Sequence, residues 1–464
     1  MFAMHPLTNL WRVRFVIPVA VAMAILPAGR GMAQIGGGGF GFGGQAVGGI
    51  SVDADGIVGN LEPGALESLA AERAKALADA EWSGEAGAAR KVSLKAVAAA
   101  VRESMTKSVP LSPEVVFLGG LQRIEHVFVD PDNHDIVLSG PAEPLAVDAT
   151  GTVVGATSRR PPLHLEDLVV ALRAIDKARA GGMTCSIDPT PDGITKLQDL
   201  LRRQTKMAAD PQGLFTAMEE ALGPQRVTVA GVPADSRFAR VLVAADYRMK
   251  RIGMGLEGSG LEKLPSYLAM VPAGGRATAL PRFWLEAAYD PIARDADELA
   301  WRLSGRRMTC LTESDVAGDN GMKRAAAPAD AVARRWCDAM TANYDALAAK
   351  QPIFAELTNC IDLAVVAALI HGRQLDKRAG CDLAAFIDPA TLPLPKYDVP
   401  TSVPTVATGL KKGGNWVLSA SGGVKFQPWQ FAANTAVAAD VAAVRTQALA
   451  ARPADAASTG CSWD

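Results

Sequence analysis

The sequence lacks an excess of charge of either sign. Its 464 residues carry 47 Lys and Arg against 49 Asp and Glu, which gives a formal net charge of −2, and they contain no basic block. Nucleic acids and anionic membranes attract clustered positive charge. We therefore expect neither of them as a partner.

The sequence also lacks the short motifs of common hydrolases and metalloenzymes. It contains no HExxH, no GxSxG and no CxxC, and it has only five His residues. These absences remove the usual signals for a zinc protease, a serine hydrolase and a structural zinc site. We expect no metal and no cofactor.

Long apolar runs are scarce as well, although hydrophobic residues make up 49% of the chain. After the N-terminal segment, no run reaches the eighteen or so residues that a membrane-spanning helix needs. The best candidate, Ile361–Ile370, is short and includes Asp362. We expect no transmembrane helix in the mature chain.

The N-terminal segment has the pattern of a secretory signal peptide. Arg12 and Arg14 precede an apolar run, Phe15–Pro27, and Gly31-Met32-Ala33 places small residues where a signal peptidase cuts. We expect cleavage after Ala33, a mature chain that begins at Gln34, and a secreted or periplasmic protein.

The remaining chain mixes hairpin signals and amphipathic helices without strict alternation. This mixture predicts an α+β fold, and we expect two packed subdomains with a helical hairpin in the C-terminal half, formed by 329–350 and 353–371. The expected order is a signal peptide at 1–33, a Gly-rich flexible leader at 34–49, an N-terminal α+β region at 50–205, a C-terminal α+β region at 206–433, and a helix with a tail at 434–464.

Three segments share a Val-Asp-Ala-like pattern that predicts β-hairpins. They are VDADGIV at 52–58, VDATGTV at 147–153 and a looser copy at 416–424. The Asp and Gly residues serve the turn, and Gly56 is expected to have a positive φ. Asp53-Ala54-Asp55-Gly56 also has the spacing that begins a calcium loop, but the later ligands are missing, which favours the plain turn. The apolar run 238–245 predicts a strand.

Six cysteines, an even number, agree with an oxidising compartment and predict up to three disulfides. They are Cys185, Cys310, Cys337, Cys360, Cys381 and Cys461. Cys360 and Cys381 are the first-choice pair, because the chain is expected to reverse after the helix that ends at His371 and to bring Cys381 back alongside it. Cys337 is the main competitor for Cys360.

Three acidic residues are candidates for catalysis. Asp188 and Asp192 belong to a turn that begins a helix, and Asp246 opens the charged run DYRMKR. Helix capping and salt bridging explain these positions without any substrate. The run Gly253–Gly258 fits GxGxxG, but it follows a helical stretch and is more consistent with the end of a helix.

Several of these runs occur in an order that resembles an uncharacterised secreted bacterial family, classed as a domain of unknown function. The resemblance is carried by DYRMKRIGMGLEGSGLEKLPSYL at 246–268, the VDADGIVG opening, CSIDPTPDG at 185–193 and FAELTNCIDLAVVAALI at 354–370. It covers most of the mature chain and implies no activity.

Two functions remain open. The preferred one is a non-enzymatic exported protein that binds, or forms part of, a component of the cell envelope or extracellular space. The alternative is a hydrolase of envelope polymers that uses Asp188, Asp192 or Asp246, and it requires two carboxylates that converge on a cleft.

Overall fold

A computed structural model describes most of the chain after its N-terminal segment. The described residues are 47–78, 86–203, 211–272, 280–312, 315–318, 321–324, 331–409, 416–453 and 460–464. The expected signal peptide and the leader up to residue 46 lie outside them.

The fold is α+β, as predicted, and it contains two large mixed sheets. The six-stranded sheet has the order β13 (Arg307–Thr312), β10 (Arg282–Ala288), β19 (Ser421–Phe426), β8 (Met183–Asp188), β9 (Gln225–Ala230), β16 (Ser402–Val403). Only the β10–β19 pairing is parallel in this sheet.

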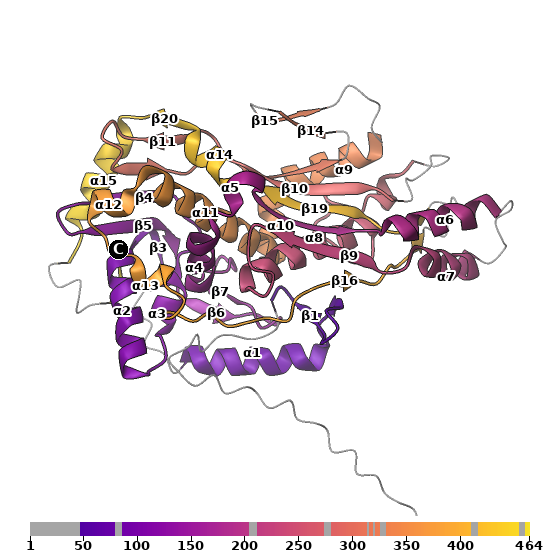
Figure 1. The fold of residues 1–464 in the computed structure, drawn as a ribbon, viewed down its shortest axis with the longest axis horizontal. Coiled ribbons are helices and arrows are strands. Elements are labelled where there is room, and N and C mark those ends of the chain that lie inside the picture. The colour runs from indigo at the N-terminus through magenta and orange to yellow at the C-terminus, as the bar shows by residue number, and fades with distance from the viewer. Residues whose placement is uncertain are drawn as a thin grey trace, which may run out of the picture. The chain divides into compact units, whose positions relative to one another are not determined.

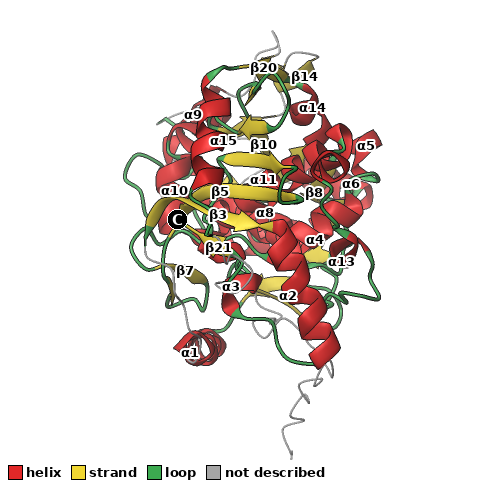
Figure 2. Cartoon of the chain, turned by 90° about the vertical axis from the view of Figure 1, so that its left-hand side faces the viewer, coloured by secondary structure: helices red, strands yellow, loops and turns green. Residues whose placement is uncertain are grey.

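The seven-stranded sheet has the order β20 (Thr435–Val437), β11 (Ile292–Arg294), β12 (Ala300–Arg302), β4 (His126–Asp130), β5 (Asp135–Ala142), β3 (Gly87–Ser93), β21 (Ser462–Trp463). Figure 2 shows β3, β5 and β21 lying side by side. Each large sheet takes strands from both sides of residue 205, so neither belongs to one expected region alone.

Three buried helices form the core that the two sheets share. They are α4 (Leu165–Ala174), α8 (Arg237–Met254) and α11 (Pro352–Arg373). In Figure 1, α4 and α11 lie between the seven-stranded sheet on the left and the six-stranded sheet on the right. One continuous cluster of buried apolar side chains extends from Val47 to Cys461.

Among the described residues, α11 alone is long and apolar enough to cross a membrane by length and composition. It is longer than the run Ile361–Ile370 suggested. However, 94% of its most apolar stretch is buried inside the fold. In this structure α11 is therefore a core helix.

Twelve further helices are described outside this group of three. They are α1 (Pro63–Ala78), α2 (Leu94–Lys107), α3 (Pro113–Val116), α5 (Ala178–Gly181), α6 (Pro191–Arg203), α7 (Pro211–Leu222), α9 (Ala331–Ala342), α10 (Tyr344–Lys350), α12 (Leu375–Ala379), α13 (Ala384–Ile387), α14 (Pro428–Ala433) and α15 (Asp440–Ala450), with 3₁₀ turns at Leu118–Gly120 and Leu268–Met270. The expected helical hairpin forms, but its first arm is broken at Asn343 into α9 and α10.

Two of the three predicted hairpins form. In β1 (Ile50–Val52) with β2 (Val58–Asn60), Asp53 Oδ1 accepts hydrogen bonds from the amides of Asp55 and Ile57, both at 2.9 Å. Asp148 makes the same turn between β6 (Leu145–Val147) and β7 (Val153–Gly155). Each carboxylate is thus used by its own backbone, which confirms the plain turn.

The third predicted hairpin was wrong. Trp416–Val417 forms β18 and pairs with β17 (Thr408–Gly409), whereas β19 enters the six-stranded sheet between β10 and β8. A further short ribbon joins β14 (Asp315–Gly318) to β15 (Gly321–Arg324). The looser copy lacks the Asp whose side chain closes the other two turns.

The strand predicted at 238–245 is instead the first half of α8. A short apolar run is compatible with a buried strand or a helix buried on every side, and length decides between them. Here Ser236 caps the helix by accepting a hydrogen bond from the amide of Ala239 at 3.1 Å. Gly255 ends it with φ 75°. Ser236 is therefore the local sequence signal for the start of this helix, and the strand prediction overlooked it.

Replacing Gly56 by Val should destabilise the fold. Gly56 has φ 80°, and an added Cβ would lie 2.5 Å from Thr401 Oγ1 and 2.7 Å from Val399 O. We expect the free energy of unfolding to fall by about 1–3 kcal/mol in urea titrations. Gly64→Ala in α1 is the control, because its Cβ would meet nothing within 4 Å. Equal stability of the two variants would contradict the strained turn.

Candidate functional site

The predicted acid Asp246 lies in a buried ion pair on α8. Its Oδ2 accepts a hydrogen bond from Lys250 Nζ at 2.9 Å, and the same ammonium donates to Ile187 O at 2.8 Å and Gly422 O at 3.0 Å. An ammonium has three protons. Lys250 therefore uses all of its donors inside the fold, and it ties α8 to β8 and β19.

Asp188 lies at the end of β8 and is electrostatically coupled to Asp246. Burial, opposed by Lys250 and assisted by Asp188, raises the pKa of Asp246 to about 7. Asp188 Oδ1 itself accepts from the amide of Gly422 at 3.1 Å and from Arg282 at 3.4 Å. Thus the structure brings two of the three predicted acids within electrostatic range of each other.

The third acid, Asp192, does not join them. Its side chain is 90% exposed on α6 and lies 3.8 Å from Lys196 of the next turn. Its position agrees with the helix-start interpretation of the DPTPDG turn, in which Thr190 Oγ1 accepts from the amide of Gly193 at 3.0 Å.

A half-open pocket of about 150 Å³ lies beside the Asp246–Lys250 pair. We call it the Gln225 pocket. It is lined by Val58, Gly59, Ile187, Gln225, Tyr247, Lys250, Arg251, Met254, Leu256, Val403, Pro404, Val406 and Ala420. Most of these side chains are apolar. They come from β2, β8, β9, α8 and β16, from the segments that follow α8 and β16, and from the segment before β19.

Gln225 carries the unusual polar atom of this pocket. Its side chain is 6% exposed, and its Oε1 is buried without a hydrogen-bond partner. A buried acceptor that lacks a partner costs about 1–3 kcal/mol. Such groups are rare in folded proteins and call for an explanation.

The charged side chains at the pocket are engaged with one another. Arg251 and Arg248 both donate to Glu257, which also accepts from Asn60 Nδ2 at 3.2 Å. Burial raises the pKa of Glu257, but the two arginines together bring it below its ordinary value. Burial also raises the pKa of Tyr247. The GxGxxG run lies here as the C-terminal cap of α8, so it ends a helix as predicted.

Exposed apolar side chains border the same pocket. Val406, which lines it, is 38% exposed, and Ile57, whose neighbour Val58 lines it, is 40% exposed. Ile57 forms an isolated bridge to Ser402, next to the lining residue Val403. The pocket therefore opens onto a surface that an apolar ligand or partner could cover.

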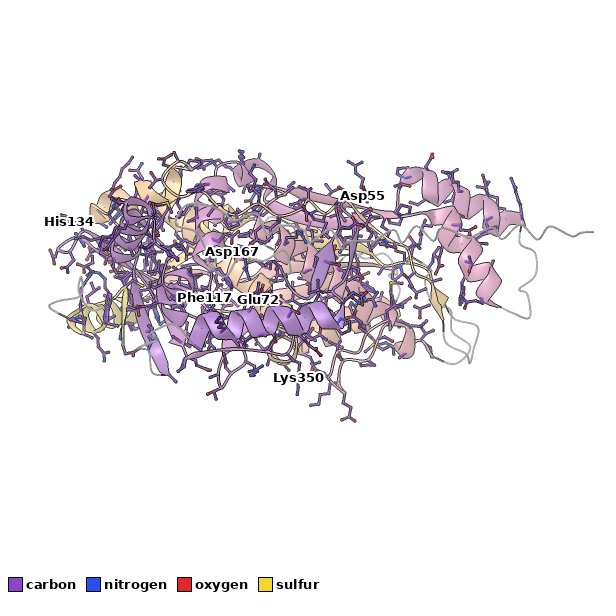
Figure 3. The ribbon with its side chains drawn as sticks, turned by 90° about the horizontal axis from the view of Figure 1, so that it is seen from below. Asp55, Glu72, Phe117, His134, Asp167 and Lys350 are labelled. Atoms are coloured by element: carbon purple, nitrogen blue, oxygen red, sulfur yellow. The ribbon has the colours of Figure 1, made fainter. Side chains whose placement is uncertain are left out.

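A second buried ionic cluster joins the core helices. Arg237 at the start of α8 donates to Asp167 of α4 and to Glu356 of α11, the latter at 2.7 Å. Burial alone would lower the pKa of Arg237, but the two carboxylates raise it above its ordinary value. Asp167 is labelled in Figure 3. Arg73 in α1 interacts electrostatically with both Arg237 and Glu356.

Glu166 extends this cluster to the connector after α13. Its Oε2 accepts from the hydroxyl of Tyr397 at 3.2 Å, and its Oε1 has no partner. Burial, followed by the charge of Asp167, raises the pKa of Glu166 to about 8. The carboxyl is therefore largely protonated at neutral pH.

All six cysteines are buried, and no disulfide forms among the described residues. Cys360 contacts Asp167, whereas Cys381 lies near Asp135 and the backbone of Ile136. The predicted Cys360–Cys381 pairing is therefore not formed. The helix continues thirteen residues beyond Cys360 to Arg373, a rise of about 20 Å. The segment that was expected to lead back toward Cys360 instead contains the helix α12.

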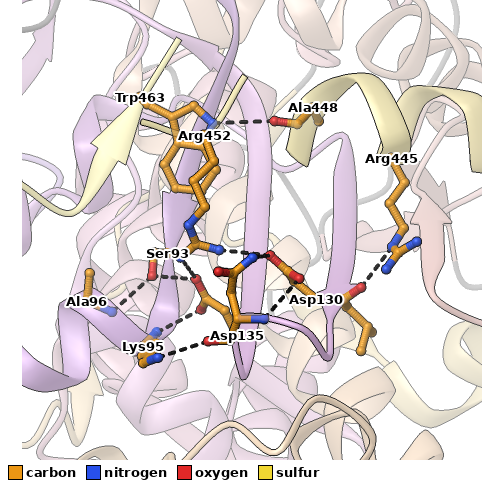
Figure 4. A network of polar contacts seen from close by, with 11 residues as sticks. Ser93, Lys95, Ala96, Asp130, Asp135, Arg445, Ala448, Arg452 and Trp463 are labelled. Atoms are coloured by element: carbon orange, nitrogen blue, oxygen red, sulfur yellow. Dashed lines mark hydrogen bonds and ion pairs between the residues drawn. The ribbon is translucent and has the colours of Figure 1, made fainter. Parts of the chain in front are cut away.

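A larger groove of about 690 Å³ lies between α2, α3 and the segment after α15. Figure 4 shows the network at its edge, where Arg452 donates to Asp130 at 2.9 Å and to Asp135, and lies over the ring of Trp463. Asp135 also accepts from Ser93 Oγ at 2.6 Å and the amide of Lys95 at 3.0 Å. No described lining residue of this groove has a buried side-chain N or O atom without a partner.

No group of three or more His, Cys, Asp or Glu side chains that could hold a metal occurs among the described residues. Comparison with known proteins gives one family match. Residues 185–267 match a family described as "Protein of unknown function (DUF1598)". No curated protein and no solved structure matches the chain.

The matched segment contains the Asp246–Lys250 pair and seven of the thirteen residues that line the Gln225 pocket. It includes two runs that carried the resemblance in the sequence, 185–193 and nearly all of 246–268. Sequence reasoning identified Asp188 and Asp246 but missed Gln225, whose only signal was a polar residue at the start of an alternating strand.

Removing the positive charge of Arg237 should strongly destabilise the protein. Arg237→Met leaves Asp167 and Glu356 without their common partner, and we expect a loss of about 3–5 kcal/mol in urea unfolding. The triple variant that also carries Asp167→Leu and Glu356→Leu should recover most of this loss, because it leaves no carboxylate unpaired. A single variant as stable as the parent would contradict the shared ion pair.

Glu166 should make stability depend on pH. The folded chain keeps a proton on Glu166 up to about pH 8, whereas the ordinary pKa is 4.5. The contribution of this group is therefore fully present below pH 4.5 and is lost as the pH rises through 8. Glu166→Gln should be more stable than the parent at pH 8, and the difference should shrink toward pH 4.5. Asp192→Asn is the exposed control, and a difference that does not change with pH would refute the raised pKa.

Proposed function

We propose that this chain is an exported, non-enzymatic binding protein of the cell envelope or extracellular space, and that it takes its ligand at the Gln225 pocket. The observation that carries the proposal is that Gln225, whose buried Oε1 has no hydrogen-bond partner, belongs to the wall of a small, mostly apolar pocket with an apolar border. The neighbouring Lys250 has no donor left for a substrate. Recognition therefore fits this site better than proton transfer by its lysine.

Export rests on the sequence. Arg12 and Arg14, the apolar run after them and the small residues at Gly31-Met32-Ala33 support a cleaved signal peptide and a secreted or periplasmic location. The resemblance to a secreted bacterial family points to the same compartment. The partner is then an envelope or extracellular component, and the balanced charge argues against nucleic acid.

A hydrolase of envelope polymers is the second candidate. One observation favours it: Asp246 has a pKa raised to about 7, and Asp188 is among the causes. A carboxyl with a pKa near 7 is suited to general acid catalysis. Against it, Asp246 is fully buried and is paired with Lys250.

The binding proposal is tested with the mature protein, tagged and used to retain components from an extract of the native envelope. Val406→Trp should block the mouth of the pocket and reduce the retained component at least tenfold, whereas Val437→Trp should not, because Val437 is 62% exposed on β20 of the other sheet. Equal retention by both variants would remove the pocket from the proposal.

Two further measurements accompany this experiment. The intact mass of protein from the native host should correspond to a chain that starts near Gln34, and a chain that retains Met1 would contradict export. A broad hydrolase screen should show no activity. Activity that Asp246→Asn abolishes would replace the binding protein with the hydrolase.

A further inference from the structure

We infer that the ligand of the Gln225 pocket is a small, neutral molecule with an apolar body and one N–H or O–H donor. This inference rests on the binding function proposed above and assigns a chemical class to the ligand. It follows from the size of the pocket, from the use of its charges and from its one unpartnered acceptor.

The volume limits the apolar body. A cavity of about 150 Å³ lined by aliphatic and aromatic side chains is large enough to hold a molecule such as benzene. The Gln225 pocket has this volume and is bordered by Val58, Met254 and Val406. It therefore fits one ring or a compact pair of rings, and it is too small for a polymer chain or a peptide helix.

The charges disfavour an ionic ligand. The ammonium of Lys250 donates its three hydrogen bonds to Asp246, Ile187 O and Gly422 O. An anion that binds Lys250 would therefore have to displace one of these contacts inside the fold. No acidic residue of the described chain lines the pocket, and the nearby Asp246 is paired with Lys250 through Oδ2, so a cation would find no carboxylate in the pocket wall. The free-energy cost of removing a charged ligand from water would then not be offset by an ion pair in the pocket.

The unpartnered acceptor selects a donor. Gln225 Oε1 has almost no contact with solvent, but the amide of Gln is attached through a soft terminal torsion and can turn toward a ligand. A donor that reaches this oxygen removes the penalty of a buried, unsatisfied acceptor. We expect this hydrogen bond to strengthen binding roughly tenfold.

The test uses indole and benzofuran, which have the same shape and differ in that only indole carries an N–H donor. Calorimetric titration of the mature chain should show indole binding roughly tenfold more tightly than benzofuran. Gln225→Met, which replaces the amide with a side chain of similar size, should bind both probes equally. Val406→Trp should bind neither, and Val437→Trp should behave like the parent.

Equal affinity of the parent for the two probes would overturn the role of Gln225, and this comparison needs no variant to fold. Absence of binding by both probes would overturn the small-molecule ligand. In that case the retention experiment decides the binding function. If Val406→Trp retains less of an envelope component than the parent does, the binding function stands, and an apolar side chain of a partner protein is the occupant of the pocket. Binding of indole without any retained envelope component supports the ligand class and removes the envelope partner.

Discussion

The arrangement of the core depends on one guanidinium that two carboxylates share. Arg237 lies where α4, α8 and α11 meet, and it binds Asp167 and Glu356 with the side chains of all three residues buried. Burying three charges costs several kcal/mol per ion unless their geometry is good. The shared pair therefore does little to increase stability, but it penalises any sliding or rotation of one helix against the others.

This constraint fixes the position of the candidate site. Arg237 follows directly on the cap residue Ser236, so the start of α8 is set both by its cap and by its ion pair. Lys250 lies thirteen residues further along the same rigid helix, where it reaches the carbonyls of β8 and β19. The pocket is built against this end of α8. Two buried ionic contacts on one helix thus align the helical core with the six-stranded sheet.

Local chemistry made much of the fold predictable. The Asp and Gly residues of the first two hairpins specify structure within a few residues, and these predictions were confirmed. The prediction failed where distant contacts decide. The run 238–245 shows no helical period because α8 is buried on every side, and Cys360 lies against Asp167, which is far away in sequence. The same reason hid the pocket, since Gln225 gains its importance only from the segments that enclose it.

The composition of the pocket wall has a kinetic consequence. Val58 and Val403 line the same small volume although they are separated by more than three hundred residues of chain. Contacts of such long sequence separation close large loops and form slowly. Hairpins such as β1–β2 can form early by themselves, whereas the wall that contains both residues requires that the chain has already collapsed correctly around α8. We therefore expect the pocket to be completed late in folding, once the native topology has been reached.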